Sequence, residues 1–322
     1  MAQKISAELN SHIDSLRNNV NQVVQGKEEV VDLVLTCVLA GGHVLIEDVP
    51  GVGKTTLARA VALSLGCSFQ RIQFTSDMLP SDVIGVSLFN QKTQEFEFRK
   101  GPLFSQVVLA DEINRTSPRT QSALLESMNE GKITTQGQTY DLERPFLVFA
   151  TQNPIESFGA YPLPDSQLDR FLMRLHMGYP DPETEKHVLR NRKMNEPVEA
   201  LKAVLNRDVL LKLQEEVDLV HMEEALEDYL HALILETRES PLLSVGVSTR
   251  GALLFHRAVR AFARLHGRDY VLPDDIKTLA VPCLAHRISL KQRTNADAWS
   301  SAQSSEAERV VLDMLNRLAV PL

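Results

Sequence analysis

The sequence has little of what a secreted or membrane-spanning protein needs. Only three of its 322 residues are cysteine, and Cys37, Cys67 and Cys283 lie too far apart to form a metal-ligand motif. They are typical of buried thiols in a reducing compartment. No apolar run approaches the roughly 20 residues that cross a bilayer, and the polar amino terminus lacks an apolar signal core. These absences predict a cytoplasmic protein.

Positive charge is also in short supply. The chain has 34 Lys and Arg against 42 Asp and Glu, a net charge of −8, and a pI near 5.6. Bulk electrostatic binding of nucleic acid or of an anionic membrane needs the opposite balance. No nucleic-acid partner is therefore expected. The 43% hydrophobic content is enough to bury one large domain or two ordinary ones.

Short apolar runs rich in Val, Leu, Ile and Phe alternate with helical patterns in the first half of the chain. Such runs predict strands buried on both faces of a parallel sheet, and the helices between them predict right-handed crossovers. The predicted strands are residues 43–47, 69–74, 107–110, 146–150 and 171–177. The sequence therefore predicts an α/β core.

Two further patterns interrupt or end this alternation. Residues 83–98 and 132–142 each pair β-prone runs around a polar turn, which predicts two hairpins. Pro180 and Pro182 mark a boundary after which no strand pattern follows. We therefore expect a first domain, 1–180, that includes an amino-terminal helix, and a second part, 181–322, made of a linker and a smaller all-helical domain.

Residues 48–56, DVPGVGKTT, lie between an apolar strand and a helical stretch. Phosphate binding needs this context, because successive N–H groups and a helix amino terminus converge on the anion. Lys54 would reach the β- and γ-phosphates, and the Thr55 hydroxyl would coordinate Mg²⁺. Asp48 departs from the phosphate-loop pattern, which has glycine there, and the alternative is a chance glycine-rich turn. Nucleotide contacts are expected from Gly51, Val52, Gly53, Lys54, Thr55 and Thr56.

Two adjacent carboxylates, Asp111 and Glu112, follow the apolar run 107–110. α/β sheets bind ligands at the carboxyl ends of their strands. Asp111 would hold Mg²⁺, and Glu112 would orient and polarise the attacking water. A solvated strand end is the alternative, and the nearby phosphate loop argues against it.

A third apolar run, residues 146–150, is followed by the polar residues 151–153, the last of which is Asn153, and then by Pro154. Asn153 is placed to hydrogen-bond the attacking water or the γ-phosphate. An Asn before a Pro is also common in simple turns, so this segment alone leaves both readings open.

Residues 43–55, 101–131, 146–171, 248–276 and 284–288 resemble the MoxR family of AAA+ ATPases throughout. The resemblance covers roughly residues 20 to 290. It implies a P-loop AAA+ parallel-sheet core with a smaller all-α carboxyl-terminal lid. It also implies ATP and Mg²⁺ as cofactors, and a homo-oligomer, a hexameric ring with nucleotide sites at the subunit interfaces.

The same resemblance assigns roles to three further residues. Asn153 corresponds to the sensor-one position, and Arg170 to an arginine finger that reaches the γ-phosphate of a neighbouring subunit. Arg250 corresponds to the sensor-two arginine, in its own subunit or in a neighbouring one. Arg115 and Arg174 are possible assistants, with surface ion pairs as the alternative.

The function that the resemblance implies is an ATP-hydrolysing, chaperone-like remodelling factor. It would assemble or activate a partner complex, such as a protein with a von Willebrand factor A domain, which can be membrane-associated. Two alternatives remain: an AAA+ nucleic-acid motor or loader, and a nucleotide-binding switch with little turnover. Net charge argues against the first, and the presence of Glu112, Asn153 and Arg170 argues against the second.

Overall fold

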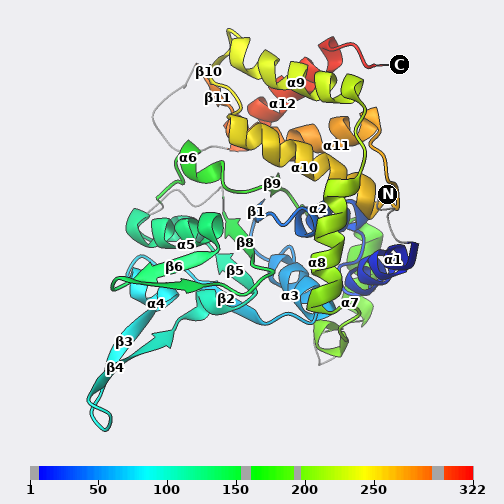
Figure 1. Cartoon of the computed structure of the whole chain (residues 1–322). Coiled ribbons are helices and arrows are strands. Elements are labelled where there is room, and N and C mark those ends of the chain that lie inside the picture. Colours follow the sequence, from blue (N-terminus) through cyan, green and yellow to red (C-terminus); the bar gives the residue numbers. More distant parts are fainter. Residues whose placement is uncertain (1–6, 154–160, 192–196, 292–300, 322) are drawn as a thin grey trace.

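A computed structural model describes residues 7–153, 161–191, 197–291 and 301–321 (Figure 1). Its centre is a five-stranded sheet in the order β2-β5-β8-β1-β9, and every pairing in it is parallel. The strands are β1 (Val44–Glu47), β2 (Phe69–Gln73), β5 (Val107–Asp111), β8 (Leu147–Gln152) and β9 (Met173–Leu175). All five predicted strands and the parallel α/β core are confirmed.

The three central strands are buried on both faces, as predicted. In β1, Val44 and Ile46 join one hydrophobic cluster and Leu45 joins the other, so alternate side chains feed opposite faces. The prediction of two-sided burial is wrong for β2. This strand lies at the edge of the sheet, and only Ile72 in it is buried.

Helices cover both faces of the sheet. Those of the core are α1 (Ala7–Asn21), α2 (Glu28–Leu39), α3 (Lys54–Ser64), α4 (Pro80–Ile84), α5 (Pro118–Glu130) and α6 (Asp165–Leu168), with short 3-10 turns η1 (Pro102–Phe104) and η2 (Ile113–Arg115). Helices α1, α2 and α3 pack on one face, and α4 and α5 pack on the other. Helix α5 begins where its sequence indicates: the Ser117 hydroxyl accepts a hydrogen bond from the backbone of Thr120, and Pro118 occupies the first turn.

Both predicted hairpins form. The first pairs β3 (Gly85–Asn90) with β4 (Glu95–Lys100), and the second pairs β6 (Lys132–Thr135) with β7 (Gln138–Asp141). The β3–β4 hairpin projects away from the body of the molecule (Figure 1). The Phe98 ring at its base stacks on Tyr140 of the second hairpin at 4.6 Å.

The chain after Tyr179 is mainly helical. It comprises α7 (Pro182–Asn191), η3 (Pro197–Ala200), α8 (Arg207–Glu216), η4 (Val217–Leu219), α9 (Glu224–Glu239), α10 (Thr249–Leu265), α11 (Pro273–Leu284), η5 (Ala285–Arg287) and α12 (Ser301–Arg317). It also contains a small antiparallel pair, β10 (Leu243–Val245) with β11 (Ser289–Leu290), which corrects the expectation of no strand there. These strands are too short to leave a periodic signal in the sequence.

Helices of this second part cover the β9 edge of the sheet. Helix α11 packs against β9, and α10 packs against α2. One hydrophobic cluster runs from Ile13 in α1, across a face of the sheet, to Leu315 in α12, so the two parts share a core. No helix in the described ranges has both the length and the apolarity that a membrane span requires.

Candidate nucleotide site

The predicted site segments meet at the carboxyl end of the sheet, where the strands end. Strand β8 lies between β1 and β5, and all three strands run in the same direction, so their carboxyl ends are adjacent. The Asp48 N–H donates to the Gln152 carbonyl at 3.2 Å, which joins the start of the phosphate loop to the end of β8. Asp111 ends β5, and Asn153 follows β8.

The loop backbone explains its glycines. Gly51 has φ 88° and Gly53 has φ 98°, a region that other residues rarely adopt. A Cβ on Gly51 would meet nothing within 4 Å, so backbone conformation rather than crowding calls for glycine there. Gly53 precedes α3, and it has no side chain to accept from the first-turn N–H groups. The amino end of α3 can therefore receive an anion.

Asp48 has a structural role that sequence reasoning missed. Its Oδ2 accepts hydrogen bonds from the backbone N–H groups of Met177, at 2.7 Å, and Gly178, at 2.6 Å. Its Oδ1 accepts from the N–H of Val49. A glycine could make none of the side-chain bonds. The aspartate therefore ties the phosphate loop to the segment that follows β9.

Lys54, the first residue of α3, lies among acidic groups. Its Nζ donates to the Asp48 carbonyl at 2.6 Å. Burial is the main effect on the pKa of Lys54 and lowers it, while the charges of Asp48, Asp111 and Glu112 oppose that shift. The ammonium group, the Asp111 carboxylate at the end of β5 and the Glu112 carboxylate directly after it thus belong to one site.

Asp111 is held by two residues that were not predicted. The Thr151 hydroxyl donates to Oδ1 at 2.5 Å, and Arg71 donates to Oδ2 from Nε at 3.1 Å and from Nη2 at 2.6 Å. The carboxylate is therefore already balanced by a cationic group. Within the described ranges, no group of three or more His, Cys, Asp or Glu side chains is arranged to hold a metal ion.

The oxygen donors of this site suit Mg²⁺. This ion prefers oxygen ligands, and in nucleotide enzymes it is usually bound through one or two protein groups together with substrate phosphates. The Asp111 carboxylate and the Thr55 hydroxyl, at the start of α3, are oxygen donors of this kind.

Glu112 occupies a strained backbone position. Its φ of 57° and ψ of 48° lie in the left-handed region, which costs a non-glycine residue on the order of 1 kcal/mol or more. The Thr151 hydroxyl accepts from the Glu112 N–H at 2.9 Å. The Glu112 carboxylate accepts from Gln73 Nε2 at 2.6 Å and forms an ion pair with Arg115 Nε at 3.2 Å. This ion pair is partly exposed, so it fits both the assisting role and the surface ion pair that were considered for Arg115.

Gln73 and Arg71 come from the edge strand β2. The signal in the sequence that could have found them is the alternation of polar residues in this strand. Residues 69–74 read FQRIQF, in which Arg71 and Gln73 point to the same face. A strand buried on both faces has no room for two such side chains. This pattern alone could have identified an edge strand that serves the site.

Asn153 is buried at the carboxyl end of β8. The strand order places it between the phosphate loop and Asp111. Pro154, on which the simple-turn alternative depends, lies outside the described residues.

Arg174 differs from expectation, because it forms a buried network and not a surface ion pair. Its side chain is 2% exposed and lies 3.6 Å from Glu47, the last residue of β1. A second contact, also at 3.6 Å, reaches Glu308 of α12. Gln152 donates to the same Glu47 at 2.5 Å. The network joins α12 to the strand ends beside the phosphate loop.

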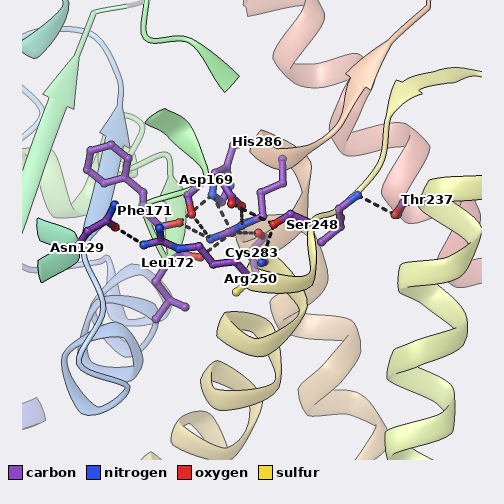
Figure 2. Close-up of polar contacts among 12 residues, drawn as sticks. Asn129, Asp169, Phe171, Leu172, Thr237, Ser248, Arg250, Cys283 and His286 are labelled. Atoms are coloured by element: carbon purple, nitrogen blue, oxygen red, sulfur yellow. Dashed lines mark hydrogen bonds and ion pairs between the residues drawn. The ribbon is translucent and has the colours of Figure 1, made fainter. Parts of the chain in front are cut away.

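Arg170 and Arg250 lie at the opposite end of the sheet, where the strands begin. Arg170 comes shortly before Met173, the first residue of β9. Met173 pairs with Val44, the first residue of β1, so Arg170 lies at the amino ends of the strands. Arg250 donates from Nη2 to Asn129 near the end of α5 (Figure 2). His43, just before β1, contacts the Met128 carbonyl at 3.1 Å, which places this end of α5 at the same end of the sheet.

The two arginines are near each other and far from the phosphate loop of their own chain. Burial lowers the pKa of Arg170, and the neighbouring charge of Arg250 lowers it further. Strands β1, β5 and β8 contain 4, 5 and 6 residues. At about 3.3 Å per residue, these strands separate the amino end of the sheet from its carboxyl end by roughly 13–20 Å.

Comparison with known proteins agrees with this arrangement. The family described as "ATPase family associated with various cellular activities (AAA)" matches residues 43–173, and the AAA lid domain matches residues 235–310. A crystal structure of a candidate ATPase from Cytophaga hutchinsonii superposes with a TM-score of 0.87 at 38% identity, over 98% of this chain and 96% of that one.

Two relatives extend the match over nearly the whole chain. The uncharacterised protein YeaC of Bacillus subtilis is 48% identical over 94% of this chain and 93% of its own. Chaperone MoxR1 of Mycobacterium tuberculosis is 37% identical over 99% of this chain and 85% of its own.

The fold and the site define a P-loop ATPase of the AAA+ type, with a helical lid. Within that class, the chain belongs to the MoxR family of AAA+ ATPases. It is an ATPase of the MoxR chaperone type, so the predicted family, fold class and activity are confirmed.

Proposed function

We propose that the protein hydrolyses ATP with Mg²⁺ at sites shared between neighbouring subunits of a cytoplasmic homo-oligomeric ring. The ring has six members and uses hydrolysis to remodel a partner protein. One observation carries the proposal: Arg170 and Arg250 lie at the amino ends of the strands, whereas Lys54 and Glu112 lie at the carboxyl ends. An arginine at the amino ends is too far from the phosphates of its own chain, whereas a neighbouring subunit can bring its phosphates to it.

Each residue at the carboxyl end of the sheet has a distinct task in this proposal. Lys54 binds the β- and γ-phosphates, while Thr55 and Asp111 hold Mg²⁺, which neutralises phosphate charge when bound. The wrapping backbone is provided by Gly51, Val52, Gly53 and Thr56. Thr151 keeps the Asp111 carboxylate oriented through its 2.5 Å hydrogen bond.

Hydrolysis needs a water molecule aimed at the γ-phosphate. Glu112 polarises this water by accepting its proton, and Asn153 hydrogen-bonds the water or the γ-phosphate. The neighbour's Arg170 and Arg250 stabilise the charge that develops on the transferred group, because a guanidinium is always charged and forms paired hydrogen bonds. The site is complete only when two subunits meet.

Mixing two inactive variants tests the shared site. Lys54→Ala removes the phosphate contact but leaves both arginines, and Arg170→Ala keeps the phosphate loop. Each variant alone should be nearly inactive. A mixed ring should recover turnover, since some interfaces pair an intact Lys54 site with an intact Arg170. An arginine finger contributes ~10³–10⁵ in rate, so a minority of repaired interfaces should exceed background.

A matched mixture provides the control. Lys54→Ala and Glu112→Gln both damage the carboxyl end of the sheet, so mixing them creates no complete site and should restore nothing. Recovery in this control would mean that subunit exchange itself restores activity. If mixed rings form and Lys54→Ala with Arg170→Ala stays inactive, the two residues are not shared as proposed. Repeating the test with Arg250→Ala decides whether that arginine is also donated to the neighbour.

The client proposal depends on family membership. Similarity to Chaperone MoxR1 supports a remodelling role, and we propose a protein with a von Willebrand factor A domain, which can be membrane-associated, as the client. Co-purification of such a candidate with the Glu112→Gln variant in the presence of ATP should exceed that with Lys54→Ala. Equal capture by both would contradict nucleotide-dependent engagement. Gel shift with DNA at two salt concentrations tests the competing nucleic-acid role.

A further inference from the structure

One buried side chain of the lid joins the segments that carry the two arginines. Arg287, in η5, has a side chain that is 1% exposed and that reaches the loop between α6 and β9, where Arg170 lies. Figure 2 shows the polar groups that gather there, including Asp169, Ser248 and Arg250.

The Arg287 guanidinium binds the backbone on both sides of Arg170. Its Nη2 donates to the Phe171 carbonyl at 2.6 Å and to the Asp169 carbonyl at 3.3 Å, the residues on either side of Arg170. Its Nη1 donates to the carbonyls of Leu172, at 3.1 Å, and Cys283. With Nε donating to Asp169 Oδ1 at 2.9 Å, all five N–H groups of the guanidinium have partners.

Asp169 carries the connection to Arg250. While its Oδ1 accepts from Arg287, its Oδ2 accepts from the Ser248 hydroxyl at 3.0 Å. Ser248 is the N-cap of α10, and its hydroxyl accepts from the Gly251 N–H at 2.9 Å. Arg250 lies in the first turn of this helix, so a single chain of contacts leads from one arginine segment to the other.

Gly251 gives the Arg287 side chain its room. A Cβ at this position would lie 2.8 Å from Arg287 Cδ and 3.0 Å from Nε, closer than packed atoms approach. Glycine inside a helix costs roughly 0.5–1 kcal/mol relative to alanine. The close passage of Arg287 over the first turn of α10 explains why this position, next to Arg250, is a glycine.

We propose that Arg287, acting through Asp169 and Ser248, is a positioning residue that presents Arg170 and Arg250 to the neighbouring subunit as one rigid pair. This inference rests on the proposed sharing of the site. Lysine cannot replace Arg287, because it has three donors on a single nitrogen instead of five in a planar fork. Since Arg287 belongs to the lid and Arg170 precedes a strand of the core sheet, the same contacts tie the lid to the core beside the two arginines.

The test uses the mixed rings and places a lesion in one subunit type at a time. Asp169→Asn keeps the shape of the side chain and weakens its hold on Arg287. In the Lys54→Ala subunit, which donates the arginines, this change should lower the recovered turnover at least tenfold. In the Arg170→Ala subunit, which donates no functional pair, the same change should alter turnover by less than twofold.

A second buried arginine offers a matched control. Arg264 has a fully buried side chain and pairs with Glu216 at 2.8 Å, away from the two arginine segments. Glu216→Gln therefore removes an equivalent charge from the partner of a buried guanidinium. In the donor subunit it should leave recovered turnover within twofold of the parent mixture, and melting curves should show comparable losses of stability for both variants.

The outcomes are distinguishable. Equal loss of turnover with Asp169→Asn in either subunit type would overturn the proposal in favour of a purely structural role. Full recovery with Asp169→Asn in the donor would overturn it as well. If the parent mixture recovers nothing, the shared site itself is wrong.

A second variant keeps the proposal testable if Asp169→Asn does not fold. Ser248→Asp preserves a good N-cap, but places a negative charge against Asp169. It should reduce turnover at least tenfold when placed in the donor and leave it within twofold when placed in the acceptor. The absence of this asymmetry in a folded protein would contradict the positioning role.

Discussion

Gln73 Nε2 donates a 2.6 Å hydrogen bond to Oε2 of Glu112, across the boundary between β2 and the end of β5. Arg115 contacts the same oxygen at 3.2 Å, so both partners hold the Glu112 carboxylate from one side. Hydrogen bonds to charged groups contribute about 1.5–3 kcal/mol. They therefore orient the carboxylate, which has a second oxygen, Oε1, with which to accept from a water.

Glu112→Gln should bind ATP with the affinity of the parent and hydrolyse it ~10²–10⁴-fold more slowly, the usual effect of losing a general base. A glutamine amide oxygen can still accept from Gln73, so the local structure should persist. Steady-state phosphate release and titration with ATP measure the two effects. A rate within about threefold of the parent would remove Glu112 from this role.

Lys54→Ala should lose nucleotide binding itself. Its ammonium group donates a hydrogen bond to the Asp48 carbonyl, within the phosphate loop itself, so the rest of the fold depends little on it. We expect affinity for a non-hydrolysable ATP analogue to fall at least tenfold by isothermal titration, with a melting temperature within a few degrees of the parent. Undiminished affinity would mean that the loop does not cradle phosphate.

Shortening the turn at residues 90–94 should leave ATPase activity and ring assembly intact but impair action on a client. Phe89 and Phe96 are 53% and 74% exposed on the projecting hairpin, so they contribute little to the core. The measurements are phosphate release, size-exclusion chromatography and nucleotide-dependent client capture.

A pair of single variants separates the tip of the hairpin from its base. Phe96→Ala should preserve the melting temperature, whereas Phe98→Ala should lower it, because Phe98 stacks on Tyr140 and contacts Phe104 at 5.8 Å. A collapsed melting transition for Phe96→Ala would show that the tip is structural.

Stability should fall as pH drops from 6.5 towards 4, in part through His43. Burial is the main cause that lowers the pKa of His43 from 6.5 to about 4. The unfolded chain therefore takes up this proton first, and the contribution present above pH 6.5 is lost on acidification. At pH 5 the loss is about 2 kcal/mol, since each pKa unit corresponds to about 1.4 kcal/mol.

His43→Gln isolates this contribution. The pKa of His176 is raised by its hydrogen bond to Glu308, and that of His266 by its hydrogen bond to Asp32. Their contributions run in the opposite direction and fade as pH rises through the folded-state pKa. Urea unfolding at pH 7 and pH 5 should therefore show a smaller acid loss for His43→Gln than for the parent. Equal losses would contradict the assignment.

Local patterns predicted a large part of the fold. The apolar run 43–47 and the glycines of the phosphate loop specify a strand, a turn and a helix start through short-range effects, namely burial of apolar side chains and permitted backbone angles. The hairpins and the cap at Ser117 depend on equally local chemistry. For the same reason the candidate residues at Lys54, Asp111 and Glu112 could be identified without a structure.

Tertiary structure decided the features that depend on which segments become neighbours. The place of β2 at the sheet edge exposes Arg71 and Gln73 to the site, and the shared direction of β1 and β9 puts Arg170 at the end of the sheet opposite to Lys54. Four of the hydrogen bonds of the Arg287 guanidinium join it to residues 115 to 118 positions away in the chain. No periodicity or spacing encodes such contacts, because they arise from packing between elements, whereas the sequence by itself determined the elements and their local chemistry.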